Sequence, residues 1–90
     1  MIIQKLEKAL AAALDTAGVE LPEGFQVNVE SSADLRFGDY QSNAAMILAK
    51  VARTNPRELA AKVIEALELE ELAEADIAGP GFINFRIKKE

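Results

Sequence analysis

Residues 72–87 read LAEADIAGPGFINFRI, and this stretch decides the fold. One side of its final six residues carries Ile83, Phe85 and Ile87, and the other carries Phe82, Asn84 and Arg86. Such alternation, preceded by the turn residues 79–81, predicts a strand that is buried on one side only. Residues 72–78 are expected to form the partner strand across that turn, despite their acidic side chains. The stretch therefore predicts a strand pair with one polar face.

Upstream of this pair, three segments carry the signals of helices. Residues 2–17 repeat apolar side chains at three- and four-residue steps and are followed by Gly18, which is typical of an amphipathic helix and its C-terminus. A second helix is expected over residues 44–53, and its N-terminal cap is either Ser42 or Asn43. Its expected apolar stripe consists of Met46, Ile47 and Val51. A third helix is expected to begin at residues 55–58, where asparagine and proline form a start signal, and to continue through Leu67.

The remaining residues are expected to complete a small sheet. Residues 25–30 alternate strictly between apolar and polar side chains after a turn at 21–24, which predicts a half-buried strand. Residues 31–43 favour a loop with a short strand near 35–37. This order of elements predicts an α+β fold, in which a small antiparallel sheet of three to four strands has helices packed on one face. The chain, residues 1–90, is expected to be a single domain.

The composition excludes several kinds of active site. The chain has no cysteine and no histidine, so it offers neither a thiolate nucleophile nor an imidazole base or metal ligand. Residues 79–81 lack the Lys-Ser/Thr that follows a phosphate-binding loop. Asp34, Asp39 and the acidic run 65–76 lack the spacing of a calcium loop and are typical of solvated surface. We therefore expect no catalytic residue and no metal site in this chain.

The charge balance limits how the chain binds an anion. Fifteen acidic and ten basic residues give a formal net charge of −5, whereas proteins that bind nucleic acid through charge alone are basic. Contact with phosphates must therefore be local. A basic rim is one candidate, although solvated helix surface explains the same residues. Its members are Arg36, Lys50, Arg53 and Arg57.

Residues 36–43 read Arg-Phe-Gly-Asp-Tyr-Gln-Ser-Asn and combine a cation, two aromatic rings, two amides and a glycine. Proteins that bind unpaired bases stack them on aromatic rings and hydrogen-bond to their edges. Candidates for stacking are Phe37 and Tyr40, and candidates for the base edge are Gln41 and Asn43. The structural alternative is that the first aromatic belongs to the core, the last amide caps a helix, and residues 38–39 form an ordinary turn.

The polar side of the predicted sheet is a second candidate surface. It would combine amides and a guanidinium with one aromatic ring, as single-stranded nucleic-acid platforms do. The alternative is an ordinary exposed sheet face. The residues concerned are Gln26, Asn28, Phe82, Asn84 and Arg86.

Three blocks of the chain together resemble the N-terminal domain of arginyl-tRNA synthetase. They are FGDYQSNAAM at 37–46, NPRELA at 55–60 and IAGPGFINF at 77–85, and the resemblance covers essentially the whole chain. It implies an α/β module, ahead of a catalytic core, that contacts the D-loop at the corner of tRNA for arginine. The RNA contacts that it implies are Phe37, Tyr40, Gln41 and Asn43, with Asn84 as a further candidate. For phosphate contacts we expect Arg36 and neighbouring basic residues.

The resemblance also implies what this chain lacks. A parent synthetase would use ATP and Mg²⁺, but the chain has no His-x-Gly-His or Lys-Met-Ser-Lys type motif, so it is expected to bind no cofactor and to catalyse nothing alone. Its expected partners are tRNA for arginine and the catalytic core of the same synthetase. We expect it to act in the cytoplasm and to bind no membrane. The isolated domain is expected to be a monomer. The alternative is a protein-interaction or dimerisation domain that does not bind RNA.

Overall fold

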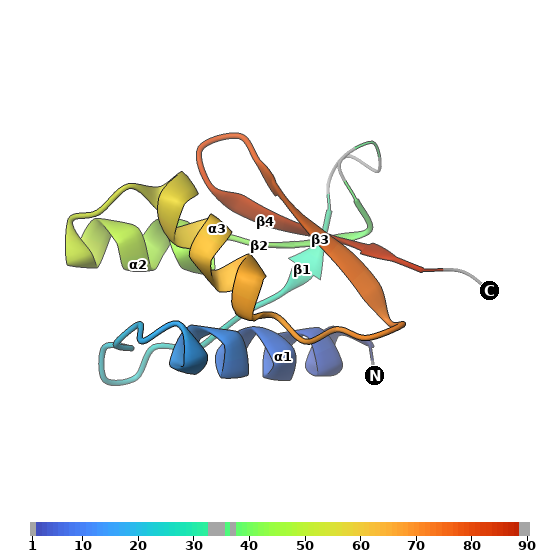
Figure 1. Cartoon of the computed structure of the whole chain (residues 1–90), viewed down its shortest axis with the longest axis horizontal. Coiled ribbons are helices and arrows are strands. Elements are labelled where there is room, and N and C mark those ends of the chain that lie inside the picture. The colour runs from blue at the N-terminus through green and yellow to red at the C-terminus, as the bar shows by residue number, and fades with distance from the viewer. Residues whose placement is uncertain (1, 33–35, 37, 89–90) are drawn as a thin grey trace.

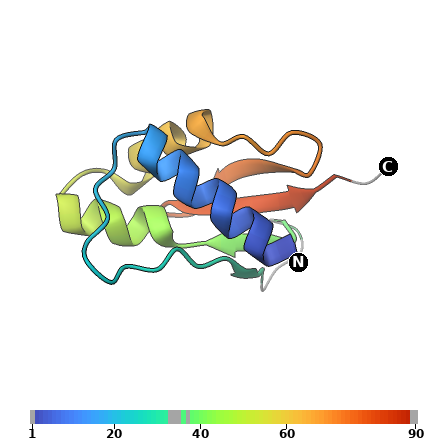
Figure 2. The ribbon, with the colours of Figure 1, turned by 90° about the horizontal axis from the view of Figure 1, so that it is seen from below.

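The computed structural model describes residues 2–32, 36 and 38–88. Its four strands form one antiparallel sheet in the order β1-β2-β4-β3, with β1 at Glu30–Ser31, β2 at Tyr40–Ser42, β3 at Ala73–Ala78 and β4 at Phe82–Ile87. The helices are α1 (Ile2–Thr16), α2 (Ala44–Ala52) and α3 (Pro56–Ala66). Helix α1 lies below the sheet in Figure 1 and crosses in front of the strands in Figure 2. The α+β fold with helices on one face is confirmed.

The core lies between the helices and the sheet. Its largest fully buried apolar side chains are Leu6, Leu10 and Leu14 of α1, Leu48 of α2, Val63 of α3, and Ile83 and Phe85 of β4. The leucines of α1 recur every four residues, so they form one stripe along the helix. Full burial of each such side chain contributes about 1.5–3 kcal/mol. None of the helices in the described part of the chain is long and apolar enough to span a membrane.

Residues 25–30 form less of a strand than their alternation predicts. Val29 is buried and Asn28 exposed, as the alternation requires, but only Glu30 of this segment belongs to a strand. The Val29 N–H donates to Glu7 Oε2 at 2.9 Å, so a side chain of α1 takes the place of a neighbouring strand. The prediction for residues 25–30 is therefore wrong about strand pairing, but it assigns the buried side of the segment correctly.

The position of the strand within residues 31–43 also differs from the prediction. The short strand predicted near residues 35–37 falls mostly outside the described residues. Residues 40–42, which the sequence assigned to a loop, form β2 between β1 and β4. Three residues are too few to show a hydrophobic alternation, so the sequence carries no local signal for this strand.

Helix α2 is confirmed, but its predicted apolar stripe is wrong. Val51 is 62% exposed and Ile47 is 43% exposed. The buried residues are Ala44, Ala45, Leu48 and Ala49. Small side chains allow α2 to pack closely on α3 and the sheet, so three alanines face the core together with Leu48, while Ile47 and Val51 lie outside. The apolar character of a position was a poor guide to its burial here.

Two asparagines precede the second and third helices, but only one of them caps its helix with its side chain. Asn55 Oδ1 accepts hydrogen bonds from the N–H groups of Arg57 at 2.9 Å and Glu58 at 3.1 Å. The side chain of Asn43 makes no capping hydrogen bond, and Ser42 Oγ accepts from the Ala44 N–H at 3.1 Å. The side chain of Asn43 is therefore not needed for helix capping.

This difference predicts unequal effects of two matched substitutions. Asn55→Ala should lower the free energy of unfolding by about 1 kcal/mol, because two amide groups at the start of α3 lose their acceptor. Asn43→Ala should lower it by less than half as much. Urea unfolding followed by circular dichroism measures both variants, and equal losses would contradict the assignment of the caps.

Candidate nucleic-acid interface

The sheet face turned away from the helices carries a row of four polar side chains. Gln41 of β2 lies opposite Glu30 of β1 and opposite Asn84 of β4, and Asn84 lies opposite Asp76 of β3. Directly opposed residues of antiparallel strands point to the same face, with Cβ atoms about 4.5–5.5 Å apart. The row therefore holds two amides side by side between two carboxylates. We call this side of the sheet the open face.

Two further side chains of β4 share the open face with Asn84. Phe82 is half-buried, and Arg86 is exposed opposite Glu74. Arg86 Nη2 donates to the carbonyl oxygen of Arg36 at 3.3 Å, which ties β4 to the segment before β2. The alternation of residues 82–87 thus placed the aromatic ring, the amide and the guanidinium correctly on one face. Gln26 and Asn28 do not join them, because residues 25–29 lie outside the sheet.

Asn84 is buried although no helix covers its side of the sheet. Only 4% of its surface is exposed, and its Oδ1 meets no donor within the described residues. A buried acceptor without a partner costs about 1–3 kcal/mol, and folded proteins keep few of them. The Oδ1 atom thus keeps an unused capacity to accept a hydrogen bond, although it is shielded from solvent.

Residues 38–39 hold the start of β2 against β4. The Asp39 N–H donates to the carbonyl oxygen of Phe85 at 2.8 Å, and Asp39 Oδ2 accepts from the Ile87 N–H at 2.8 Å. Gly38 has φ 139°, and a Cβ atom there would lie 2.9 Å from the same carbonyl oxygen. Both residues therefore serve the fold, and they set Gln41 beside Asn84.

The other candidates from residues 36–43 lie in different places. Tyr40 is opposite Phe85, so its half-buried side chain packs against the core on the helix side, away from Gln41. Asn43 is exposed where β2 meets α2, and Arg36 is exposed beside Arg86. Phe37 lies outside the described residues. The structure thus brings Gln41 and Asn84 together and separates Tyr40 from them.

Of the expected basic rim, Arg57 reaches the sheet. Its Nη1 donates to the carbonyl oxygen of Gly79 in the turn between β3 and β4. Lys50 and Arg53 are exposed at the C-terminal end of α2. Lys50 and Arg53 thus lie at the end of α2 and Arg57 near the start of α3, and none of the three belongs to a strand of the open face.

Sequence reasoning missed the carboxylates of the open face. They belong to Glu30, Glu74 and Asp76, and all three residues are exposed. The alternation within β3 carries a signal for two of them, because buried Ala73 marks the core side and places Glu74 and Asp76 on the other. Their position beside the amides depends on strand register, which links residues far apart in the chain.

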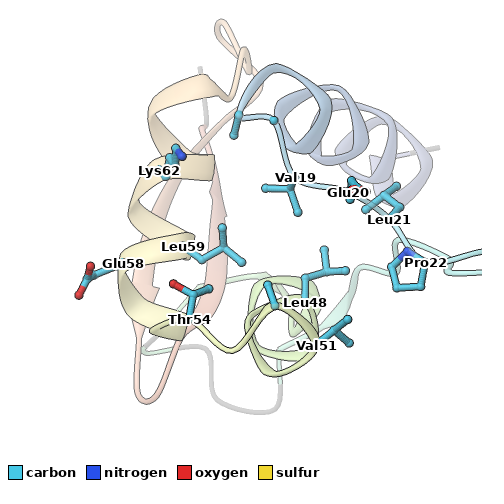
Figure 3. Close-up of a pocket in the computed structure, with 13 residues that line it drawn as sticks. Val19, Glu20, Leu21, Pro22, Leu48, Val51, Thr54, Glu58, Leu59 and Lys62 are labelled. Atoms are coloured by element: carbon cyan, nitrogen blue, oxygen red, sulfur yellow. The ribbon is translucent and has the colours of Figure 1, made fainter.

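A groove of about 730 Å³ lies on the opposite side of the molecule, between the loop after α1 and helices α2 and α3 (Figure 3). Its apolar lining includes Val19, Leu21, Leu48, Val51 and Leu59. Glu58 and Lys62 are the charged side chains that α3 contributes to the lining. Within the described ranges, no group of three acidic residues is arranged to hold a metal ion.

Comparison with known proteins identifies the family. A family model described as "Arginyl tRNA synthetase N terminal domain" matches residues 4–87. The chain belongs to this family. It is 49% identical over 88 residues to the arginine–tRNA ligase of Hahella chejuensis, and 50% identical over 86 residues to that of Pseudoalteromonas translucida. It spans 15% and 14% of the length of these two relatives, although 97% and 94% of this chain is matched.

The solved structure of Thermus thermophilus arginyl-tRNA synthetase agrees with the assignment. It superimposes with a TM-score of 0.81 at 31% identity, over 98% of this chain and 14% of that one. The resemblance seen in the three sequence blocks is therefore confirmed. In this arginyl-tRNA synthetase N-terminal domain, the first block supplies β2 and the last supplies β4, and the two meet where Gln41 lies opposite Asn84.

Proposed function

We propose that this chain is the tRNA-binding module of an arginine–tRNA ligase and that it contacts the D-loop of tRNA for arginine. The observation that carries the proposal is the buried, unpartnered Oδ1 of Asn84 beside Gln41. Membership of the family supports the choice of a tRNA as the ligand. ATP-dependent aminoacylation, with ATP and Mg²⁺, would take place in the remainder of the cytoplasmic enzyme, and this chain would add affinity and selectivity.

The proposed contact is the insertion of one unpaired base against the open face. Asn84 Oδ1 would accept a hydrogen bond from a base N–H, and the Gln41 amide would both donate and accept. Phe82 is the aromatic ring that the described residues place on the same face, and base stacking on such a ring contributes about 1–3 kcal/mol. The stacking roles of Phe37 and Tyr40 stay predictions. Arg36 and Asn43 remain candidates for contacts with the flanking backbone.

Asn84→Leu tests this proposal because it separates binding from stability. The variant keeps a side chain of similar size and removes the acceptor, so affinity for tRNA should fall about tenfold, equivalent to about 1.4 kcal/mol. The free energy of unfolding should stay constant or rise, because an unsatisfied buried polar atom disappears. An NMR titration with tRNA for arginine measures the affinity, and urea unfolding measures the stability.

Two comparisons sharpen that titration. A tRNA with an altered D-loop should bind the wild-type chain more weakly. For this tRNA, the difference in affinity between the wild type and Asn84→Leu should also be much smaller. Val51→Ser, on the groove side of the molecule, should leave both affinities unchanged. Weak binding by the separate chain is compatible with the proposal, since a tethered module acts at high effective concentration. If Asn84→Leu binds both tRNAs as tightly as the wild type does, the proposed function is wrong.

One observation favours the alternative function, a protein-interaction or dimerisation domain, and it concerns the groove. Leu21 and Val51 are large apolar residues that line it, and both are exposed, by 42% and 62%. Sedimentation equilibrium over a range of concentrations distinguishes the two functions. We expect a monomer at all concentrations. A dimer that Val51→Ser dissociates, together with an absence of tRNA binding, would favour the alternative.

A further inference from the structure

Carboxylates stand at both edges of the open face. Glu30 lies on β1, and Glu74 and Asp76 lie on β3, all on the same side of the sheet as the two central amides. Neighbouring strands are about 4.8 Å apart, so Asp76 is one strand spacing from Asn84 and Glu30 is two. Arg86 is the cation among the paired strand residues of this face, and it lies directly opposite Glu74.

We infer that Glu30, Glu74 and Asp76 act as a charge filter, which keeps RNA phosphates off the open face and reserves its centre for an uncharged base. The inference rests on the proposed function and adds to it the way in which wrong RNAs are rejected. In this view, the three carboxylates determine selectivity and do not hold the ligand.

Electrostatics supports the filter at the distances that the sheet imposes. The screening length at physiological ionic strength is about 8 Å, and one strand spacing is about 4.8 Å. A phosphate above Asn84 would therefore lie within the screening length of Asp76, and a phosphate above Gln41 within that of Glu30. Arg86, with Arg36 beside it, offsets these charges at one end of the face. A base has no net charge, so it avoids this repulsion.

The unpartnered atom of Asn84 is a second and independent observation that points to the same ligand. Asn84 is 4% exposed, and its Oδ1 is an acceptor without a donor in the described structure. A phosphate diester carries no N–H or O–H to donate, whereas the edges of bases do. The centre of the face and its edges thus select against phosphate and in favour of a base edge.

The filter explains how an acidic module binds RNA selectively. Most non-specific affinity for nucleic acid comes from phosphate contacts. A face that repels phosphates gives up this affinity for every RNA, and it recovers binding only from an RNA that presents an unpaired base. Selectivity then comes from a repulsive element as well as an attractive one.

A pair of triple variants tests the filter at equal net charge. The face variant is Glu30→Gln/Glu74→Gln/Asp76→Asn, and the control variant is Glu65→Gln/Glu68→Gln/Glu71→Gln. The control residues are exposed in α3 and in the connection to β3, outside the open face. Each variant raises the net charge by three, so their global electrostatics match. Circular dichroism and a melting temperature for each variant establish that it is folded.

The readouts are affinity and its salt dependence for two RNAs, tRNA for arginine and a poly(A)–poly(U) duplex, whose bases are all paired. The face variant should bind the duplex about tenfold more tightly than the wild type does. The logarithm of its affinity should also fall more steeply with the logarithm of salt concentration, by the amount expected for about one more phosphate contact. Its affinity for the tRNA should rise less, so the ratio of tRNA affinity to duplex affinity should fall. The control variant should change both affinities by the same small factor.

Three outcomes would overturn the inference. If the face and control variants change the RNA affinities equally, the selectivity depends on net charge alone. An unchanged affinity ratio in the face variant, while Asn84→Leu still weakens tRNA binding, would reject the filter and leave the proposed function standing. If Asn84→Leu and the altered D-loop both leave binding unchanged, the proposed function falls and the filter falls with it.

Discussion

Phe85→Ala should lower the free energy of unfolding by about 3–5 kcal/mol, the usual cost of truncating a buried phenylalanine. Phe85 is fully buried in β4, which pairs with β2 on one side and β3 on the other. Domains of ordinary stability unfold at a cost of about 5–15 kcal/mol, so this variant should lose a large part of its stability. Urea unfolding followed by circular dichroism measures the loss.

Phe82→Ala is the matched control for this substitution. Phe82 lies in the same strand, but it is half-buried on the open face. Its truncation leaves a smaller cavity and should cost less than half as much. Equal losses for the two variants would mean that the core does not lie where the buried side of β4 places it.

Gly38→Ala should lower the free energy of unfolding by about 2–4 kcal/mol, combining backbone strain with a steric clash. Its φ of 139° is rarely adopted by residues with a side chain, and the added Cβ would lie 2.9 Å from the carbonyl oxygen of Phe85. That oxygen belongs to the backbone of the central strand, so it cannot rotate away as a flexible side chain would. Thermal or urea unfolding measures the effect.

Gly24→Ala isolates the steric part of this prediction. Gly24 also has a positive φ, 80°, but nothing lies within 4 Å of the position that its Cβ would take. This control should cost about 1 kcal/mol from strain alone. If Gly24→Ala is as destabilising as Gly38→Ala, the close approach of residues 38–39 to β4 has no energetic importance.

The sequence predicted the elements that carry strong local signals. The leucine stripe of α1, the Asn-Pro start of α3 and the alternation of β4 each lie within a few residues, and each was found correctly. The fold class followed from their order. The side of β4 that holds Asn84 and Arg86 was predictable for the same reason, because alternation fixes the face of every residue in a strand.

The features that depend on distant partners were not predictable from one sequence. The β2 strand has only three residues, and its pairing with β4 joins positions more than forty residues apart. That pairing decides that Gln41 faces Asn84 and that Tyr40 faces the core. The buried side of α2 was mispredicted because close helix packing favours alanine over the larger Ile47 and Val51.

The strand order also has a consequence for the synthesis of the chain. The strand that joins the two halves of the sheet, β4, comes after the other described elements in chain order, so it leaves the ribosome after them. Helices form from local contacts, but β2 and β3 have no common neighbour until residues 82–87 emerge. A nascent chain that stops earlier therefore exposes the apolar side of an unfinished sheet, so folding of the domain must await nearly its whole length.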